Sequence, residues 1–140
     1  MPIWYQKRIY RKDLVDNPEV FFVFGDNLSR RGFGGQAKEM RGEPNAIGVA
    51  TKRYPSMTEA SFFSDAYYDE IIGLVETDLQ RVERVLKQGH DVVWPEDGIG
   101  SGLSQMPERC PRLWAWLESE RKRLERVYRN EGLTHTATEA

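Results

Sequence analysis

The order of apolar and polar positions along the chain predicts four strands. Ile3 to Tyr10 mixes aromatic and β-branched residues with charged ones, which is typical of an edge strand with one wet face. Val20 to Phe24 is an unbroken apolar run and predicts a buried central strand. Two further runs, Asn45 to Ala50 and Asp91 to Pro95, predict two more strands.

Helical patterns occupy the intervals between these strands. A short turn is expected over Lys12 to Asn17, stopped by Pro18, and a second short helix over Gln36 to Arg41. A last helix is expected from about Pro111 to Arg129. A long helix before Gly89 is indicated by apolar residues that recur at spacings of four and three: Tyr68, Ile72, Val75, Leu79, Val82 and Leu86.

Strands that alternate with helices favour an α/β fold with a mostly parallel sheet covered on both faces. The chain has 140 residues, of which 39% are hydrophobic, and this is enough for one continuous core. Residues 1–132 are therefore expected to form one domain, and the polar segment 133–140 a flexible tail. The stretch Tyr54 to Asp65 is expected to be a loop that could cover a site as a flap.

Composition narrows the classes of function. The 20 basic and 22 acidic residues are mixed along the chain and leave a formal charge of −2, so nucleic acid is not the expected ligand. Cys110 stands alone, which excludes an internal disulfide and a cysteine-rich metal site and fits a reducing compartment. No apolar run is long enough to cross a bilayer. We therefore expect a cytoplasmic protein without a membrane segment.

Two of the expected strands run into glycine-rich loops. Gly32 to Gly35 follows the central strand, and Gly98 to Gly102 follows the strand that ends at Pro95. The carboxyl ends of parallel strands meet at one edge of a sheet, so the loops are expected to form one site for an anionic ligand. Glycine lets backbone N–H groups approach a phosphate, and a helix that starts near Gln36 would add its own. The spacing matches neither standard nucleotide fingerprint, and on spacing alone ordinary turns remain the commoner explanation.

Polar side chains in the first loop allow two interpretations each. Asp26 and Asn27 stand where the strand gives way to the loop, and they either contact ligand hydroxyls or form caps and Asx turns. Arg30 and Arg31 either donate to a phosphate or remain solvated. Phe33 is a candidate for stacking on a base.

Nucleophilic and metal-dependent catalysis find little support. His90 lies at an expected helix-to-strand turn and His135 in the polar tail, so neither is placed beside Cys110. The chain shows no carboxylate cluster at ligand spacing; Glu96 and Asp97 would meet magnesium only through a bound phosphate. We expect neither a metal site nor a cofactor.

The two loops carry a resemblance that is more specific than their spacing. Phe22 to Asn27, followed by Gly34 to Ala37, resembles the macrodomain signature of an apolar strand that ends in asparagine before a glycine run. Trp94 to Leu103 is similar to the second macrodomain loop. The resemblance covers roughly Val20 to Leu117 and is strongest to small phage and bacterial macrodomain-like proteins with G-D-N, G-G-Q-A, P-N-A-I-G and D-G-I-G-x-G-L elements.

The resemblance implies a three-layer α/β/α fold with a mixed, mostly parallel sheet that binds ADP-ribose or a related nucleotide and hydrolyses ADP-ribosyl linkages in some members. By position, Asn27 would hold the distal ribose, and the second loop would wrap the phosphates. Asp26 could act beside Asn27 as a general base, which is an inference from chemistry. The complete set expected to bind ligand is Gly25, Arg31, Gly32, Phe33, Gly34, Gly35, Gln36, Asp97, Gly98, Ile99, Gly100, Ser101, Gly102 and Leu103.

Two alternatives to a hydrolase stay open. The same loops would serve a protein that sequesters a nucleotide signal without cleaving it. A protein-interaction module is the other, because Trp114 and Trp116 lie two residues apart on a helix and cannot both face one core. The expected partner is a nucleotide-type small molecule; nucleic acid would enter only as an ADP-ribosylated substrate, and no protein partner is indicated.

Overall fold

The apolar runs form one parallel sheet in the computed structural model, which describes residues 2–139 and the side chains of residues 2–128. The strands β1 (Ile3–Gln6), β2 (Phe21–Asn27), β3 (Ala46–Lys52) and β4 (Val92–Pro95) lie in the order β1-β4-β2-β3. All three strand pairs in this described part are parallel. The expectation of a mixed sheet is therefore wrong: each pair of consecutive strands is joined through a helix, and such a crossover returns the chain in the same direction.

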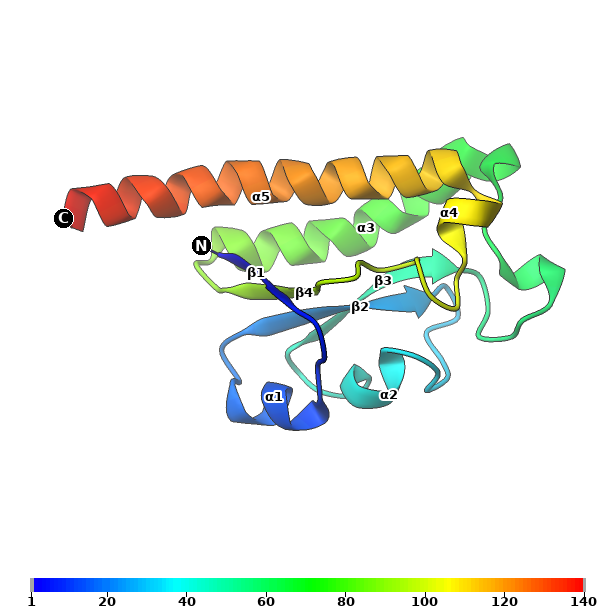
Figure 1. Ribbon diagram of the computed structural model, residues 1–140, viewed down its shortest axis with the longest axis horizontal. Helices are drawn as coiled ribbons and strands as arrows, with labels where there is room; N and C mark the ends of the chain where they lie inside the picture. Colours follow the sequence, from blue (N-terminus) through cyan, green and yellow to red (C-terminus); the bar gives the residue numbers. More distant parts are fainter. Residues whose placement is uncertain (1, 140) are drawn as a thin grey trace.

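Helices cover both faces of the sheet (Figure 1). The short helices α1 (Arg11–Asp16) and α2 (Ala37–Met40) lie on one face, and the long helices α3 (Tyr68–Lys87) and α5 (Pro111–Glu139) on the other. The α/β class and the order of elements are thus confirmed. No helix in the described part of the chain combines the length and the apolar character needed to cross a bilayer.

Three short helical segments and a longer last helix differ from the sequence-based expectations. The expected loop after β3 contains the 3-10 turns η1 (Glu59–Ser61) and η2 (Asp65–Tyr67), and the sequence did not predict α4 (Met106–Arg109). Helix α5 runs past the expected end at Arg129. The tail predicted over 133–140 falls outside the residues whose side chains are described.

The order of the helical connections explains why the loops after β2 and β4 leave the sheet toward opposite faces. Helices α1 and α2 carry the chain from β1 to β2 and from β2 to β3, in one direction across the sheet, whereas α3 returns it from β3 to β4 on the opposite face. This is the arrangement expected when all crossovers share one hand. The chain consequently leaves β2 toward one face and the neighbouring β4 toward the other, which opens a crevice between their loops.

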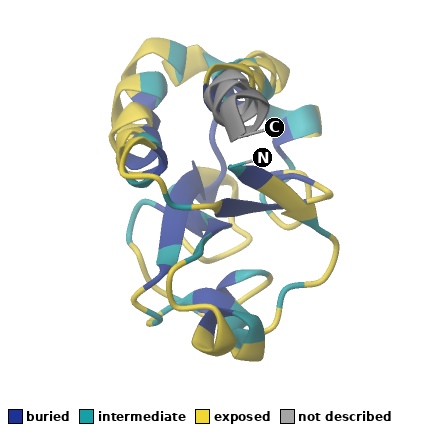
Figure 2. Ribbon diagram, turned by 90° about the vertical axis from the view of Figure 1, so that its left-hand side faces the viewer, coloured by how far each residue is buried: buried dark blue, intermediate teal, exposed yellow. Residues whose placement is uncertain are grey.

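Two apolar clusters fix these layers, one on each face of the sheet. Strands β2, β3 and β4 are mostly buried between the helices, whereas Trp4 and Tyr5 of the edge strand β1 are exposed (Figure 2). The smaller cluster joins the sheet to α1 and α2 and consists of Leu14, Phe22, Phe24, Ala37, Met40 and Val93. The larger cluster joins it to α3 and α5. Trp114 and Trp116 are both partly buried and pack against this larger cluster. The sequence argument that one of them is free to face a partner therefore does not match the packing.

Strand β3 is an edge strand, and α3 covers its free edge. The buried carboxylate of Asp78 accepts the Ala50 backbone N–H at 2.9 Å, and Arg81 donates to the Gly48 carbonyl at 2.9 Å. The same carboxylate receives two hydrogen bonds from Arg30, at 2.7 and 2.9 Å. Satisfied edge groups discourage pairing with another chain, and the Arg30 contact anchors the loop after β2 to α3.

Candidate functional site

Both glycine loops line one cavity beyond the carboxyl ends of β2 and β3. Its volume is about 240 Å³. Eleven of the sequence-predicted site residues line it: Gly25, Asp26, Asn27, Arg31, Gly32, Gly34, Gly35, Gln36, Gly100, Gly102 and Leu103. Residues that lie far apart in the sequence are thus brought together, as the strand order requires.

Five predicted residues do not line this cavity. Phe33 is 64% exposed, and Asp97 and Ser101 lie on the exposed part of the second loop. Ile99 is buried in the larger cluster. At Gly98 a Cβ would lie 3.3 Å from the Trp114 ring, so this glycine faces α5. The second loop therefore contributes its later half to the cavity.

Gln36 joins the two loops. Its Oε1 accepts the Gly25 backbone N–H at 2.7 Å, and its Nε2 donates to the Gly98 carbonyl at 3.2 Å. One amide side chain, from the residue before α2, thereby connects the end of β2 to the loop after β4. We conclude that Gln36 shapes the wall of the cavity, and that one N–H of its side-chain amide has no acceptor among the described residues.

The loops also touch at two further points. Leu103 lies within 3.7 Å of the position that a Cβ on Gly34 would occupy. Ser104 shares a 2.6 Å hydrogen bond with Thr51 at the end of β3. Gly100 has a φ of +87°, and a Cβ there would overlap the Met106 sulfur, so this position requires glycine for conformation and for space.

Asp26 is held by arginines. Its carboxylate pairs with Arg41, whose second guanidinium nitrogen lies 3.3 Å from Oδ2, and Arg30 lies 3.6 Å away. The side chain is buried over Gly48 of β3, where a Cβ would lie 3.0 Å from the Asp26 Cγ. The carboxylate that the sequence offered as a general base is therefore engaged in a buried ion pair.

Asn27 is engaged within its own loop. Its Nδ2 donates to the Arg31 carbonyl at 2.7 Å, and its Oδ1 accepts the Ser29 hydroxyl. These are the short-range contacts of a turn-forming asparagine, the alternative that the sequence left open.

Backbone N–H groups are among the donors of the residues that line the cavity. Those of Gly34, Gly35, Gly102 and Leu103 donate to no acceptor in the described part of the chain. The helix expected to add N–H groups of its own near Gln36 is α2, which has only 4 residues, so its dipole is small. An anion would be held by individual N–H groups and by charged side chains.

Lys52 is the most unusual side chain in the lining. The residue is 6% exposed, and its ammonium contacts the Met57 sulfur at 3.5 Å and the Phe62 ring at 4.8 Å, with no carboxylate partner in the described residues. Burial, and secondarily the charge of Arg109, lower the pKa of Lys52. The sequence analysis missed this residue, although its place directly after an apolar strand was a usable signal. The other lining residues that it missed are Ala37, Arg41, Thr51, Pro55 and Ser104.

The charge of the lining is positive. Its charged residues are the cations Arg31, Arg41 and Lys52 and one carboxylate, Asp26, which pairs with Arg41. Arg31 and Lys52 therefore have no carboxylate partner among the described residues. The described residues contain no group of three His, Cys, Asp or Glu side chains that could hold a metal ion.

Comparison with known proteins gives a family. A model of a family of unknown function, DUF7831, matches residues 4–120. The chain belongs to this family. No curated protein and no solved structure matches the chain.

The part matched by the DUF7831 model includes β2, β3 and β4, all of β1 except Ile3, and every residue that lines the cavity. Within it, the chemistry available is the binding of an anion by backbone N–H groups and unpaired cations, beside two hydroxyls, Thr51 and Ser104. A second cavity of about 270 Å³ lies on the other side of the first loop and shares Gly35 and Gln36 with the first.

Proposed function

We propose that this protein binds ADP-ribose or a related nucleotide with a diphosphate in the cavity between its two glycine loops. One observation carries the proposal. Residues of the loops after β2 and β4 line a single cavity and have backbone N–H groups with no acceptor among the described residues, and the same lining contains two cations without carboxylate partners. Such groups favour phosphate oxygens, and the crevice at the carboxyl ends of parallel strands is where α/β proteins place such ligands.

The dimensions support a ligand with more than one part. A cavity of 240 Å³ is slightly smaller than the roughly 300–1,000 Å³ of most small-molecule sites. It suits a ribose with its phosphate better than a complete dinucleotide. The adjoining cavity of 270 Å³ offers room for the remainder, with Gly35 and Gln36 between the two parts.

A macrodomain-like identity forms part of this proposal. Helices on both faces of the sheet and the order of the two loops support it. The parallel β1 edge departs from the mixed sheet that the resemblance implied.

Binding is favoured over hydrolysis as the primary activity. A general base needs a carboxylate that can reach a water molecule, whereas Asp26 pairs with Arg41, and Asn27 holds its own loop. The sequestering of a nucleotide without cleavage requires neither side chain to be free. Release of ADP-ribose from a modified substrate in a single turnover would assign hydrolysis to the same site.

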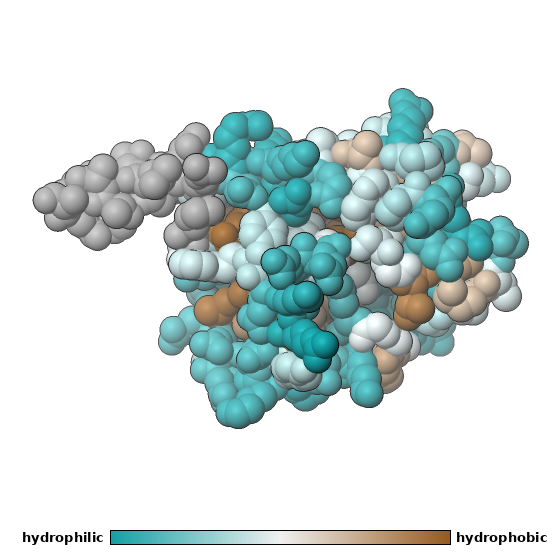
Figure 3. All heavy atoms as spheres, viewed as in Figure 1, coloured by the Kyte–Doolittle hydropathy of each residue, from teal (hydrophilic) through white to brown (hydrophobic). Residues whose placement is uncertain are grey.

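The interaction module is the weaker alternative. Trp114 and Trp116 pack inward, and the face seen in Figure 3 is mostly hydrophilic with small, separate hydrophobic groups. Protein-binding surfaces usually present larger contiguous apolar patches.

The test is calorimetric titration with ADP-ribose, AMP and NAD. Gly34→Val and Gly102→Val are suitable variants, because neither glycine has a positive φ and a Cβ at Gly102 would meet nothing within 4 Å. The new side chains would occupy the cavity and are expected to abolish binding. Gly73→Val is the matched control, since this glycine lies on α3 in equally open space. Absence of binding by the unmodified protein, or equal binding by all four proteins, would contradict the proposal.

A further inference from the structure

Two hydroxyl groups of the cavity lining, those of Thr51 and Ser104, form a hydrogen-bonded chain with a fixed direction. The Thr51 Oγ1 lies 3.2 Å from the Asp26 carbonyl oxygen and 2.6 Å from the Ser104 Oγ. A carbonyl oxygen can only accept and a hydroxyl group has one proton, so Thr51 donates its proton to Asp26. The Ser104 proton then occupies the 2.6 Å bond to Thr51. The Ser104 Oγ consequently offers a ligand only its lone pairs.

Ser104 is thereby an open acceptor in the lining. The other side-chain oxygens of the lining already accept a hydrogen bond: Asp26 from Arg41, Asn27 from Ser29, Gln36 from Gly25 and Thr51 from Ser104. No described residue donates to the Ser104 Oγ. The lining otherwise offers donors, which are the loop N–H groups and the cations Arg31 and Lys52. A ligand that brings a hydroxyl group therefore meets its acceptor at Ser104.

Thr51 cannot turn away from this chain. The residue lies at the end of β3 and is 1% exposed. Two glycines flank it, because a Cβ at Gly25 would lie 3.5 Å from its Oγ1 and a Cβ at Gly100 would lie 3.3 Å from its methyl carbon. Its oxygen therefore meets Ser104 in one orientation.

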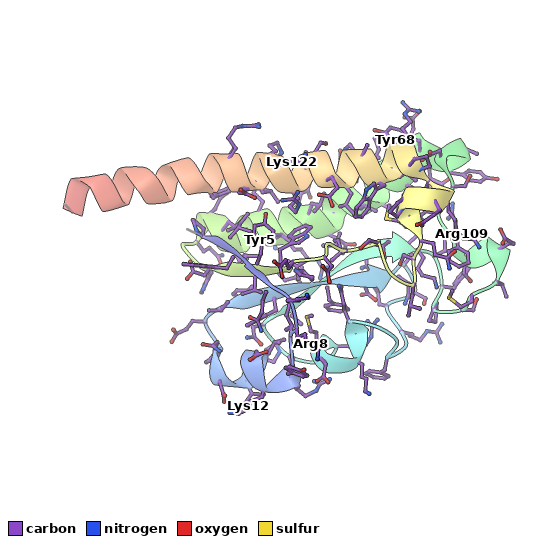
Figure 4. All side chains as sticks on the ribbon, in the orientation of Figure 1. Tyr5, Arg8, Lys12, Tyr68, Arg109 and Lys122 are labelled. Carbon is purple, nitrogen blue, oxygen red and sulfur yellow. The ribbon has the colours of Figure 1, made fainter. Side chains whose placement is uncertain are left out.

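The backbone at Ser104 is held as well. Ser104 is half-buried and lies in a turn that the Gln105 N–H closes onto the Gly102 carbonyl at 3.0 Å. Arg109, which projects from α4 in Figure 4, donates to the Gln105 side chain at 2.8 Å. The acceptor is thus in place before a ligand arrives, and binding need not order it.

We propose that Ser104, oriented by Thr51, accepts a hydrogen bond from a sugar hydroxyl beside the bound phosphate and so selects sugar phosphates over simple phosphates. The inference rests on the proposed function, because the loop N–H groups would hold the phosphate. A hydroxyl group that leaves water for the cavity loses a hydrogen bond unless it finds an acceptor there. A ligand with a carbonyl or carboxylate oxygen at the same place would face lone pairs and bind less well.

Titrations with ribose 5-phosphate and methyl phosphate test the inference on the full chain. Both probes carry a phosphate monoester, but only ribose 5-phosphate has hydroxyl groups. The two dissociation constants are measured by nuclear magnetic resonance on isotope-labelled protein, and their ratio is the selectivity. The native protein is expected to favour ribose 5-phosphate. Ser104→Ala should lower the selectivity by about 3- to 10-fold, as expected for one neutral hydrogen bond, and leave the affinity for methyl phosphate unchanged.

Variants of Thr51 separate orientation from a purely structural role. Thr51→Val keeps the shape of the side chain but removes the hydroxyl group, so Ser104 loses its partner and the selectivity should fall. Thr51→Ser keeps the hydroxyl group and should retain the selectivity. Ser101→Ala is the matched control, because Ser101 belongs to the same loop, lies outside the cavity and donates to the Asp97 carbonyl. A structural role alone would change the thermal unfolding temperature without changing the ratio of the two constants.

The possible outcomes bear on separate claims. Ribose 5-phosphate bound no more tightly than methyl phosphate, or an unchanged selectivity in Ser104→Ala, would overturn the inference. An unchanged selectivity in Thr51→Val would overturn the orienting role of Thr51. A parallel titration with ADP-ribose keeps the two proposals apart. Selectivity that depends on Ser104 in a protein that does not bind ADP-ribose would refute the proposed function alone, whereas ADP-ribose bound with no effect of Ser104→Ala on either measurement would refute the inference alone.

Discussion

Gly48 of β3 leaves the space in which the Asp26 side chain lies. A Cβ at this glycine would overlap the Asp26 Oδ2 and lie 3.0 Å from its Cβ and its Cγ. Gly48→Ala must therefore displace a buried carboxylate from its pairing with Arg41 or push β2 and β3 apart. Either response disturbs the base of the cavity.

The size of the effect follows from overpacking. Extra carbon atoms in a filled interior destabilise by about 1–3 kcal/mol, and replacing glycine in a strand returns roughly 0.5–1 kcal/mol. We expect Gly48→Ala to lower the free energy of unfolding by about 1–2 kcal/mol. Asp26→Ala should lower it by about 2–3 kcal/mol, near the lower limit for a broken buried pair, because Arg41 keeps its 2.7 Å bond to the Gly32 carbonyl.

A double-mutant cycle isolates the contact. In the Asp26→Ala background, Oδ2 and Cγ are absent and only the Cβ contact at 3.0 Å remains, so Gly48→Ala should change stability by less than about 0.5 kcal/mol. The four proteins are compared by urea denaturation monitored through tryptophan fluorescence. Additive effects within about 0.3 kcal/mol would show that the two positions do not compete for one space and would refute the reasoning.

Four further outcomes are expected. Burial raises the pKa of the Cys110 thiol to about 12, so it should resist alkylation at pH 8 until the protein is unfolded, as measured with a thiol reagent. Burial raises the pKa of Glu83, but hydrogen bonds, with that from Arg123 foremost, outweigh burial and hold the pKa below 4.5. Glu83→Gln should therefore be less stable than the native protein at pH 7. The difference in stability should shrink as the pH falls through the pKa of Glu83 in the folded protein, which urea denaturation at a series of pH values can measure. Gly73→Ala should raise the free energy of unfolding by about 0.5–1 kcal/mol, because this exposed helical position has open space. Arg31→Gln should weaken nucleotide binding and reduce its dependence on salt, which calorimetry at about 0.1 M and about 1 M salt can measure.

Much of the fold could be predicted from local pattern. The unbroken run at Val20 to Phe24 became β2, and the spacing of four and three after Tyr68 became α3. The order of the strands could not be predicted in this way, because it depends on which strands pair, and the apolar runs of all four strands look similar in the sequence. The expectation of a mixed sheet was wrong, and the local pattern could not correct it, because an edge segment such as Ile3–Gln6 is equally compatible with either direction.

Some features of the candidate site could likewise be predicted from local pattern, and others depend on tertiary contacts. Glycine loops at strand ends could be predicted, since the carboxyl ends of parallel strands converge. The role of Arg41 could not be predicted, because it depends on where α2 ends. Lys52 could have been noticed from its place after an apolar strand, but its contact with the Phe62 ring depends on tertiary packing. Asp26 and Asn27 were identified as residues of the site, but a sequence does not show whether a carboxylate meets a ligand or an arginine. Pairing with Arg41 and Arg30 decides this for Asp26.

The shortness of α2 has a consequence for how an anion would be held. A long helix would supply an aligned dipole, but four residues supply little of one, and the exposed N–H groups of the loops carry only partial charges. Most of the attraction must then come from Arg31 and Lys52. Arg31 is exposed and is screened by salt, whereas Lys52 is buried and interacts through a less polar surrounding. Arg31 would therefore attract a phosphate to the cavity from solution, and Lys52 would contact the part of the ligand that lies inside the cavity.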